Sequence, residues 1–366
     1  MLKFFTMREQ DFIPVGYKKS VQSGKVTWQS PSNIALVKYW GKKENQIPAN
    51  PSVSFTLKNC KTITTLEFQK KETRGEDFDF ELFFEGNKKD DFKPKITKFF
   101  ERIEKYSPFL KDYKLIIQTE NTFPHSSGIA SSASGMSALA LCLMSLEKQL
   151  NPELTEDYFL KKASFLARLG SGSACRSIEG ELIEWGKHES TAGSSDLFGI
   201  KYPYKVHEVF KTYQDTILLV DKGQKQVSST LGHNLMHGHP FAEARFEQAH
   251  ANLEKLQVVF ETGNLPDFIN IVESEALSLH AMMMSSEPYF ILMKPNTLEI
   301  INKIWQYRET TGVPVCFTLD AGANVHVLYP EEHKEEVLAF IKNELVAYCE
   351  KGQYICDSIG KGAEKL

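Results

Sequence analysis

The sequence lacks the features that mark several protein classes. Its net charge is −4, without the basic excess that nucleic-acid binders usually carry. The six cysteines include no C-x-x-C pair and no accompanying histidine cluster, which favours scattered free thiols over a disulfide framework or a zinc site. The longest apolar stretch, around residues 136–146, is too short to span a bilayer, and MLKFFTMREQDF is no signal peptide. We therefore expect a soluble, cytoplasmic protein with neither a nucleic-acid nor a membrane partner.

Length and composition indicate an ordinary globular protein with more than one domain. The chain has 366 residues, of which 42% are hydrophobic and 25% charged, and it shows no internal repeat or low-complexity linker. That length is comfortable for two domains, each able to bury a core. The irregular stretch KYPYKVHEVFK, residues 201–211, is the best candidate for a boundary. We predict domains at residues 1–205 and 206–366.

Hydrophobic periodicity predicts an α+β fold. Alternating or apolar runs predict strands at residues 26–30, 52–57, 62–68, 78–86, 113–120, 180–186 and 216–223, and a strand–turn–strand unit over 315–329. Helical spacing predicts helices at residues 96–106, 133–147, 152–170, 241–262, 266–283, 297–309 and 332–350. Asn151-Pro152 has the pattern of an N-cap followed by a first helical residue, and Asn296 of an N-cap. The elements do not alternate strictly as βαβ units, which argues against a doubly wound nucleotide-binding sheet.

The stretch FPHSSGIASSASG, residues 123–135, has the composition of a phosphate-binding loop. Small residues let a backbone approach a ligand closely, and the N–H groups at the start of the following helix point toward an anion. Serine hydroxyls at positions 126, 127, 131, 132 and 134 could add donors. The motif is neither a P-loop nor a dinucleotide-binding glycine pattern. A helix start that only packs small residues against a neighbour is the alternative.

Two further stretches suit anionic ligands. RLGSGSACRSIEG, residues 168–180, joins glycine and serine to Arg176, whose guanidinium can hold a carboxylate or phosphate by two hydrogen bonds. SNIALVKYWGKK, residues 32–43, places Lys38, Lys42 and Lys43 around Tyr39-Trp40-Gly41. The alternatives are an unrelated loop in the first case and a strand with a solvated basic edge in the second.

The turn DAGAN, residues 320–324, lies between two predicted strands. An aspartate in such a turn usually hydrogen-bonds its own backbone. The other interpretation is a general base at the end of a strand, next to a substrate hydroxyl.

Taken together, NIALVKYWGKK, PHSSGIASSASG, GSGSACRS, KQVSST and DAGAN stand in the order and approximate spacing of one known family. From about residue 26 to residue 329 the sequence resembles diphosphomevalonate decarboxylase, of the GHMP kinase superfamily. SLHAMMMSSEPYF, residues 278–290, is similar to that family's segment of a helical histidine followed by a turn. The resemblance implies a ribosomal-protein-S5-type N-terminal domain, a GHMP C-terminal α/β sandwich, and an active site in the cleft between them.

The resemblance also implies a reaction and roles for its residues. Mevalonate 5-diphosphate and ATP would yield isopentenyl diphosphate, ADP, phosphate and carbon dioxide, with magnesium carried on the nucleotide and with metal ligands that stay unknown. Asp320, Lys38 and Arg176 would be catalytic. The implied substrate-binding residues are Tyr39, Trp40, Gly41, Lys42, Ser171, Gly172, Ser173, Ala174, Cys175, Arg176, Ser229 and Thr230. Ser127, Gly128, Ser131 and Ser132 would line the ATP triphosphate, and a homodimer is expected because the family is often dimeric.

Three functions stay open at this stage. The first is the decarboxylase. The second is a related enzyme that acts on the monophosphate or phosphorylates the 3-hydroxyl without decarboxylation, because KKDDFKPK, residues 88–95, offers lysines where the family has an arginine. Arg176 argues against a simple kinase, since kinases of the superfamily usually carry their catalytic acid there. The third is an RNA-binding module, which the acidic net charge disfavours.

Overall fold

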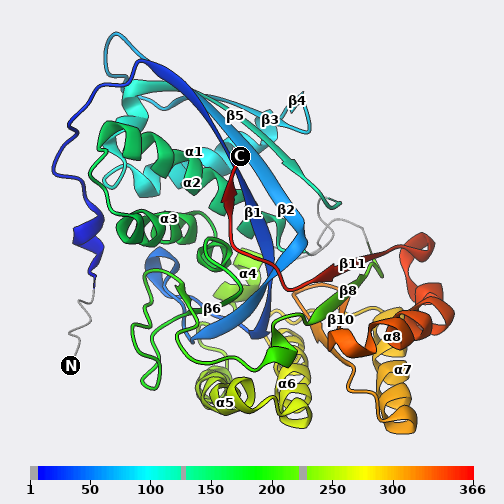
Figure 1. Ribbon diagram of the computed structural model, residues 1–366. Coiled ribbons are helices and arrows are strands. Elements are labelled where there is room, and N and C mark those ends of the chain that lie inside the picture. Colours follow the sequence, from blue (N-terminus) through cyan, green and yellow to red (C-terminus); the bar gives the residue numbers. More distant parts are fainter. Residues whose placement is uncertain (1–6, 125–128, 222–228) are drawn as a thin grey trace.

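Two β-sheets with helices packed on them make up the fold (Figure 1). The computed structural model describes residues 7–124, 129–221 and 229–366. Within these ranges the first sheet consists of β1 (Ser23–Val37), β2 (Ser52–Lys70), β3 (Asp79–Phe84), β4 (Asn87–Lys88), β5 (Tyr113–Asn121), β6 (Leu182–Trp185), β7 (Ile200–Lys201) and β12 (Glu364–Lys365). The second consists of β8 (Gln214–Leu218), β9 (Cys316–Leu319), β10 (Val325–Tyr329) and β11 (Tyr354–Ser358).

The described helices follow the predicted spacing closely in most places. They are α1 (Lys93–Ile103), α2 (Ser131–Leu150), α3 (Glu156–Gly170), α4 (Ser229–Asn234), α5 (Ala242–Thr262), α6 (Leu265–Met284), α7 (Pro295–Thr311) and α8 (Lys334–Phe340). None of the helices in the described ranges is both long and apolar enough to cross a membrane. The predicted α+β class is confirmed.

The first sheet is organised around β2. Its order is β12-β1-β2-β5-β3-β4, and only β3 and β5 run parallel. The two strand segments predicted at residues 52–57 and 62–68 form this one strand of 19 residues. Its first part pairs with β6 and its second part with β5, because β1 and β2 shift register near Pro31. Such a shift bends the β1–β2 ribbon, so that one part of β2 pairs with β6 and the other part with β5.

Two separate cores lie on the two parts of that ribbon. One core joins β1, β2 and β5 to α1, α2 and α3, and most of the apolar side chains of α2 are buried in it. A second core joins the ends of the same ribbon, through Leu36 and Phe55, to β8, α5 and α6, through Ile217, Phe260 and Phe268. The second core therefore joins the two halves of the chain in one apolar cluster.

The chain returns to the first sheet after completing the second. β12 pairs antiparallel with β1, with Trp28 opposite Lys365. The predicted boundary at residues 201–211 separates β7 from β8, and the division at residue 205 stays a prediction. A cut there would separate β12 from the strand with which it pairs.

Three local expectations were wrong. Asn151 closes α2 instead of capping α3: its N–H bonds to the Glu147 carbonyl, and Thr155 accepts from the Tyr158 N–H at 3.2 Å. α7 starts at Pro295 with Lys294 as its N-cap, so Asn296 lies inside the helix. The helix predicted at residues 332–350 ends as α8 at Phe340 and continues as a π turn and a 3₁₀ turn.

Asp357 of β11 joins the second sheet to β2. Its carboxylate accepts hydrogen bonds from the N–H groups of Lys58, Asn59 and Cys60 at 3.0, 2.8 and 2.8 Å. Because an alanine leaves these donors unpaired at a largely buried position, Asp357→Ala should lower the free energy of unfolding by roughly 2–5 kcal/mol in urea denaturation. Asp357→Asn, which keeps one acceptor oxygen, should lose less. Equal stability of the alanine variant and the wild type would contradict this role.

Glu184 of β6 is a fully buried acid. Thr191 donates to its Oε2 at 3.1 Å, Oε1 has no partner among the described residues, and burial raises its pKa to about 7. The folded chain therefore keeps a proton that the unfolded chain releases near pH 4.5, so stability should fall between about pH 4.5 and 7. Glu184→Gln should remove this loss, about 3 kcal/mol, and raise Tm at pH 8 more than at pH 5. The exposed Glu120→Gln is the control, and a pH-independent difference would disprove the assignment.

Candidate active site

A cavity of about 800 Å³ collects most of the sequence-predicted residues. Its walls come from β1 and the segment after it, from residues 84–95, from the start of α2 and from residues 170–176. α4, α6 and the β9–β10 turn close it through His233, Leu279 and Asp320. The size is in the range of small-molecule sites.

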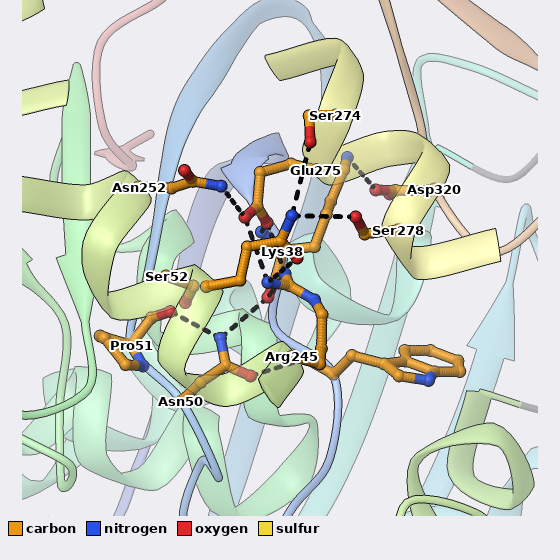
Figure 2. Close-up of polar contacts among 12 residues, drawn as sticks. Lys38, Asn50, Pro51, Ser52, Arg245, Asn252, Ser274, Glu275, Ser278 and Asp320 are labelled. Atoms are coloured by element: carbon orange, nitrogen blue, oxygen red, sulfur yellow. Dashed lines mark hydrogen bonds and ion pairs between the residues drawn. The ribbon is translucent and has the colours of Figure 1, made fainter. Parts of the chain in front are cut away.

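Lys38 and Asp320 meet in this cavity from opposite ends of the chain. Lys38 follows β1 and is 2% exposed, while Asp320 follows β9 and is more accessible; Lys38 Nζ and Asp320 Oδ1 are 3.2 Å apart (Figure 2). Burial lowers the pKa of Lys38, and Asp320 is the main influence opposing it. The backbone carbonyl of Asp320 accepts a hydrogen bond from His280 Nε2 at 3.1 Å. Burial lowers the pKa of His280 to about 4, so its ring is neutral at physiological pH.

Arg176 brings a second buried cation to the cavity wall. Its guanidinium donates to Ser52 Oγ at 2.5 Å and to Asn33 Oδ1 at 3.3 and 3.4 Å, and it lies 5.8 Å from the centre of the Trp185 ring. Within the described ranges it forms no ion pair with a carboxylate. A buried guanidinium held by neutral groups leaves positive charge available for an anionic ligand.

His233 of α4 holds the segment Tyr39-Trp40-Gly41. The ring centre of His233 lies 4.2 Å from that of Tyr39 and 4.6 Å from that of Trp40. Its Nδ1 accepts a hydrogen bond from the Gly41 N–H at 3.0 Å, which requires an unprotonated nitrogen. Burial lowers the pKa of His233 to about 3, in agreement with that role. Gly41 has φ +93°, a conformation that favours glycine.

The two glycine- and serine-containing loops approach each other at the cavity. Ser131 and Ser132 begin α2, and Ser132 Oγ lies 3.3 Å from Ser171 Oγ. An α-helix leaves its first N–H groups without intrahelical partners, so this 20-residue helix offers donors at the cavity wall. Gly172 allows the second loop to approach Tyr39, since a Cβ there would lie 2.9 Å from the Tyr39 hydroxyl oxygen.

The remaining predicted residues are placed differently. Lys42 and Ser173 line the cavity, whereas Ala174 and Cys175 are buried behind it, where their carbonyls accept hydrogen bonds from Ser137 and Ser164. Ser229 and Thr230 form the first turn of α4. Ser127 and Gly128 lie outside the described residues.

Cations gather at the end of the cavity formed by α1. Lys42, Lys89 and Lys95 line it, and Lys89 is paired with Asp91 at 3.1 Å. The pKa of Lys42 is lowered by burial and then by the nearby charges of Arg102 and Lys98. Positive charge thus accumulates at this end in excess of the local carboxylates.

Sequence reasoning missed His233 and Lys95 as cavity residues. His233 follows the KQVSST motif by three positions, but a histidine there has no pattern that distinguishes it from a surface residue. Lys95 belongs to the lysine-rich stretch 88–95, which lines the same cavity as Lys38 and Lys42 only through tertiary packing.

Comparison with known proteins gives one result. Residues 30–196 match the diphosphomevalonate decarboxylase-like N-terminal domain, and residues 216–362 match the mevalonate 5-diphosphate decarboxylase C-terminal domain. The diphosphomevalonate decarboxylase of Ganoderma lucidum is 30% identical over 334 residues, which are 87% of this chain and 81% of that protein. The chain belongs to the diphosphomevalonate decarboxylase family.

Solved structures of diphosphomevalonate decarboxylases share the fold. A complex of MDDEF with MVAPP, AMPPCP and magnesium has a TM-score of 0.79 and 27% identity, over 94% of this chain and 99% of that one. The mevalonate diphosphate decarboxylase of Staphylococcus aureus has a TM-score of 0.78 and 28% identity, over 94% and 98%. These structures confirm the predicted two-domain GHMP-type fold.

Gly232 of α4 lets Trp40 close the cavity. A Cβ at Gly232 would lie 2.5 Å from the Trp40 ring, so Gly232→Ala should displace that ring and the neighbouring Tyr39 and Lys42. We expect the KM for the family's substrate to rise about tenfold, with a smaller change in kcat, in steady-state kinetics. Gly16→Ala, where a Cβ meets no atom within 4 Å, is the matched control. A variant with unaltered KM would show that Trp40 does not need this position.

Proposed function

We propose that this protein catalyses the ATP-dependent decarboxylation of mevalonate 5-diphosphate to isopentenyl diphosphate, with release of ADP, phosphate and carbon dioxide. One observation carries the proposal beyond family membership. Lys38, Asp320 and Arg176, from distant parts of the chain, converge on one cavity, and Lys38 and Asp320 are in contact. This trio supplies a proton acceptor, a cation beside it and a separate carboxylate-binding group.

Asp320 orients the tertiary 3-hydroxyl of the substrate. An alcohol is far less acidic than a carboxylic acid, so Asp320 accepts the proton late, as the oxygen bonds to the γ-phosphorus of ATP and ADP leaves. Lys38, in contact with Asp320, stabilises the negative charge that develops on the transferred phosphoryl group. The hydroxyl, a poor leaving group, becomes a phosphate ester.

Arg176 holds the substrate carboxylate. When phosphate departs from C3, the electron pair of the bond between the carboxylate and C2 forms the new double bond, and carbon dioxide is released. The guanidinium that Ser52 and Asn33 fix in place keeps the carboxylate aligned for this step. The proton on Asp320 then passes to the released phosphate or to water.

The start of α2 suits the nucleotide triphosphate. Ser131 and Ser132 line the cavity at a helix N-terminus, where N–H groups and hydroxyls favour phosphate oxygens. Magnesium bound there would neutralise phosphate charge, and these hydroxyls are oxygen donors of the kind that a hard cation takes.

The lysines beside α1 are proposed to hold the diphosphate end of the substrate. Lys42, Lys89 and Lys95 surround that end of the cavity, and Arg102 and Lys98 lie near Lys42. They supply the charge expected of the arginine that the sequence lacks there. A monophosphate-specific enzyme or a kinase without decarboxylation is not favoured, because the relatives found are diphosphomevalonate decarboxylases. A cytoplasmic location and a homodimer remain part of this proposal.

Asp320→Asn tests the assignment directly. The amide cannot accept the hydroxyl proton, so we expect kcat to fall by about 10²–10⁴-fold while ATP binding, measured by calorimetry, is retained. Wild-type protein should give ADP, carbon dioxide and isopentenyl diphosphate from mevalonate 5-diphosphate, with little turnover of mevalonate 5-phosphate. A stable phosphorylated product without carbon dioxide, or an active Asp320→Asn variant, would refute the proposal.

A further inference from the structure

The backbone of Lys38 is held by side chains rather than by the sheet. The last pairing between β1 and β2 joins Val37 to Val53, so Lys38 lies just beyond the ladder. Its N–H donates to Glu275 Oε2 at 2.8 Å, and its carbonyl accepts from Asn50 Nδ2 at 2.9 Å and Arg245 Nη2 at 3.3 Å (Figure 2). The position of the Lys38 backbone is therefore fixed by side chains of other elements.

Glu275 is the centre of this arrangement. It lies on α6, is fully buried, and is bound by both terminal nitrogens of Arg245 from α5 and, at 2.7 Å, by Asn252 Nδ2. Burying an ion pair costs about as much desolvation as the attraction returns, so such a pair is weak support for a purely stabilising role. The pair nevertheless holds one carboxylate oxygen of Glu275 against the backbone N–H of Lys38.

The same helix also holds the partner of Lys38. His280, five residues after Glu275 on α6, donates from Nε2 to the Asp320 carbonyl at 3.1 Å. One helix thus fixes the backbone of Lys38 from one position and the backbone of Asp320 from another. Both residues of the 3.2 Å contact between Lys38 Nζ and Asp320 Oδ1 are therefore attached to α6 through their backbones.

We propose that Glu275, held by Arg245 and Asn252, is a positioning residue for the reaction: it fixes the place of Lys38 relative to Asp320. The inference rests on the proposed decarboxylase function, because its effect is measured on that reaction. Glu275 is not among the residues that line the cavity, so it would act through Lys38.

The charges that face Lys38 agree with this role. Asp320 from the β9–β10 turn and Glu275 from α6 favour its protonated form, while Arg176 and burial oppose it. Arg245 from α5 also faces it but is paired with Glu275, and the neutral His280 completes the surroundings. Loss of the Glu275 charge therefore lowers the pKa of Lys38 further and leaves the Arg245 charge uncompensated.

The test compares Glu275→Gln with Glu275→Asp. Glu275→Gln should lower kcat for mevalonate 5-diphosphate by about 10- to 100-fold, with KM within about threefold, because Lys38 is misplaced while Arg176 and Lys42 are not. The alkaline limb of its kcat–pH profile should shift to lower pH. Glu275→Asp keeps the charge on a shorter side chain, so its kcat should fall while its alkaline limb stays at the wild-type position.

A matched control separates positioning from stability. Glu147→Gln breaks a second buried pair, with Lys162 at 2.6 Å, on α2 and α3 outside the cavity lining. It should lower Tm yet keep kcat per folded molecule and the pH profile of the wild type. If Glu275→Gln does not fold, Asn252→Ala, which removes one hydrogen bond to Glu275, should still lower kcat about 3- to 10-fold.

Each failure has a distinct meaning. An inactive wild type would count against the proposed function itself. An active wild type, together with a folded Glu275→Gln variant of unchanged kcat and pH profile, would overturn the positioning role. So would an Asn252→Ala variant with wild-type kcat, or a Glu147→Gln variant with the same kinetic defect as Glu275→Gln.

Discussion

A buried ammonium group must be matched by negative charge and hydrogen-bond acceptors, and this requirement at Lys38 organises the molecule. The lysine follows the end of β1, and the carboxylates that act on it come from other elements. Asp320 reaches it from the second sheet and Glu275 from α6. The active site forms only when the two halves of the chain are packed in this relative position. The packing of α6 against β1 is therefore required for function as well as for stability.

The shared core explains how the two halves of the chain keep this relative position. Leu36 and Phe55 on the β1–β2 ribbon pack with Ile217, Phe260 and Phe268 from the second half, in one apolar cluster. Interfaces of this kind resist sliding, because interdigitated side chains permit few alternative arrangements. The Lys38–Asp320 distance is thus supported by apolar packing below it and by the Glu275–Arg245 pair beside it. The cations around Lys42, by contrast, come from elements of the first half alone.

Much of this could be predicted from the sequence, and the rest could not for physical reasons. Period-two and helical patterns located most strands and helices, and the glycine- and serine-rich loops predicted anion sites because their chemistry is local. The predicted helix caps at Asn151 and Asn296 were wrong, because the N-cap of α3 is Thr155 and the N-cap of α7 is Lys294. Glu275, Arg245 and His233 carried no local signal: each acts on a residue about 190 to 240 positions away in the chain. Such contacts follow from tertiary packing alone.

The return of β12 to β1 has a consequence for biogenesis. During synthesis the first half emerges with Trp28 and Gln29 of β1 lacking their β12 partners and with the Leu36 and Phe55 surface uncovered, until the second half has followed. Unpaired strands and exposed apolar surface are the features that attract chaperones and favour aggregation. Ribosome-bound nascent chains of this protein should therefore need protection until late in translation, and separating its halves for expression would recreate that vulnerable state permanently.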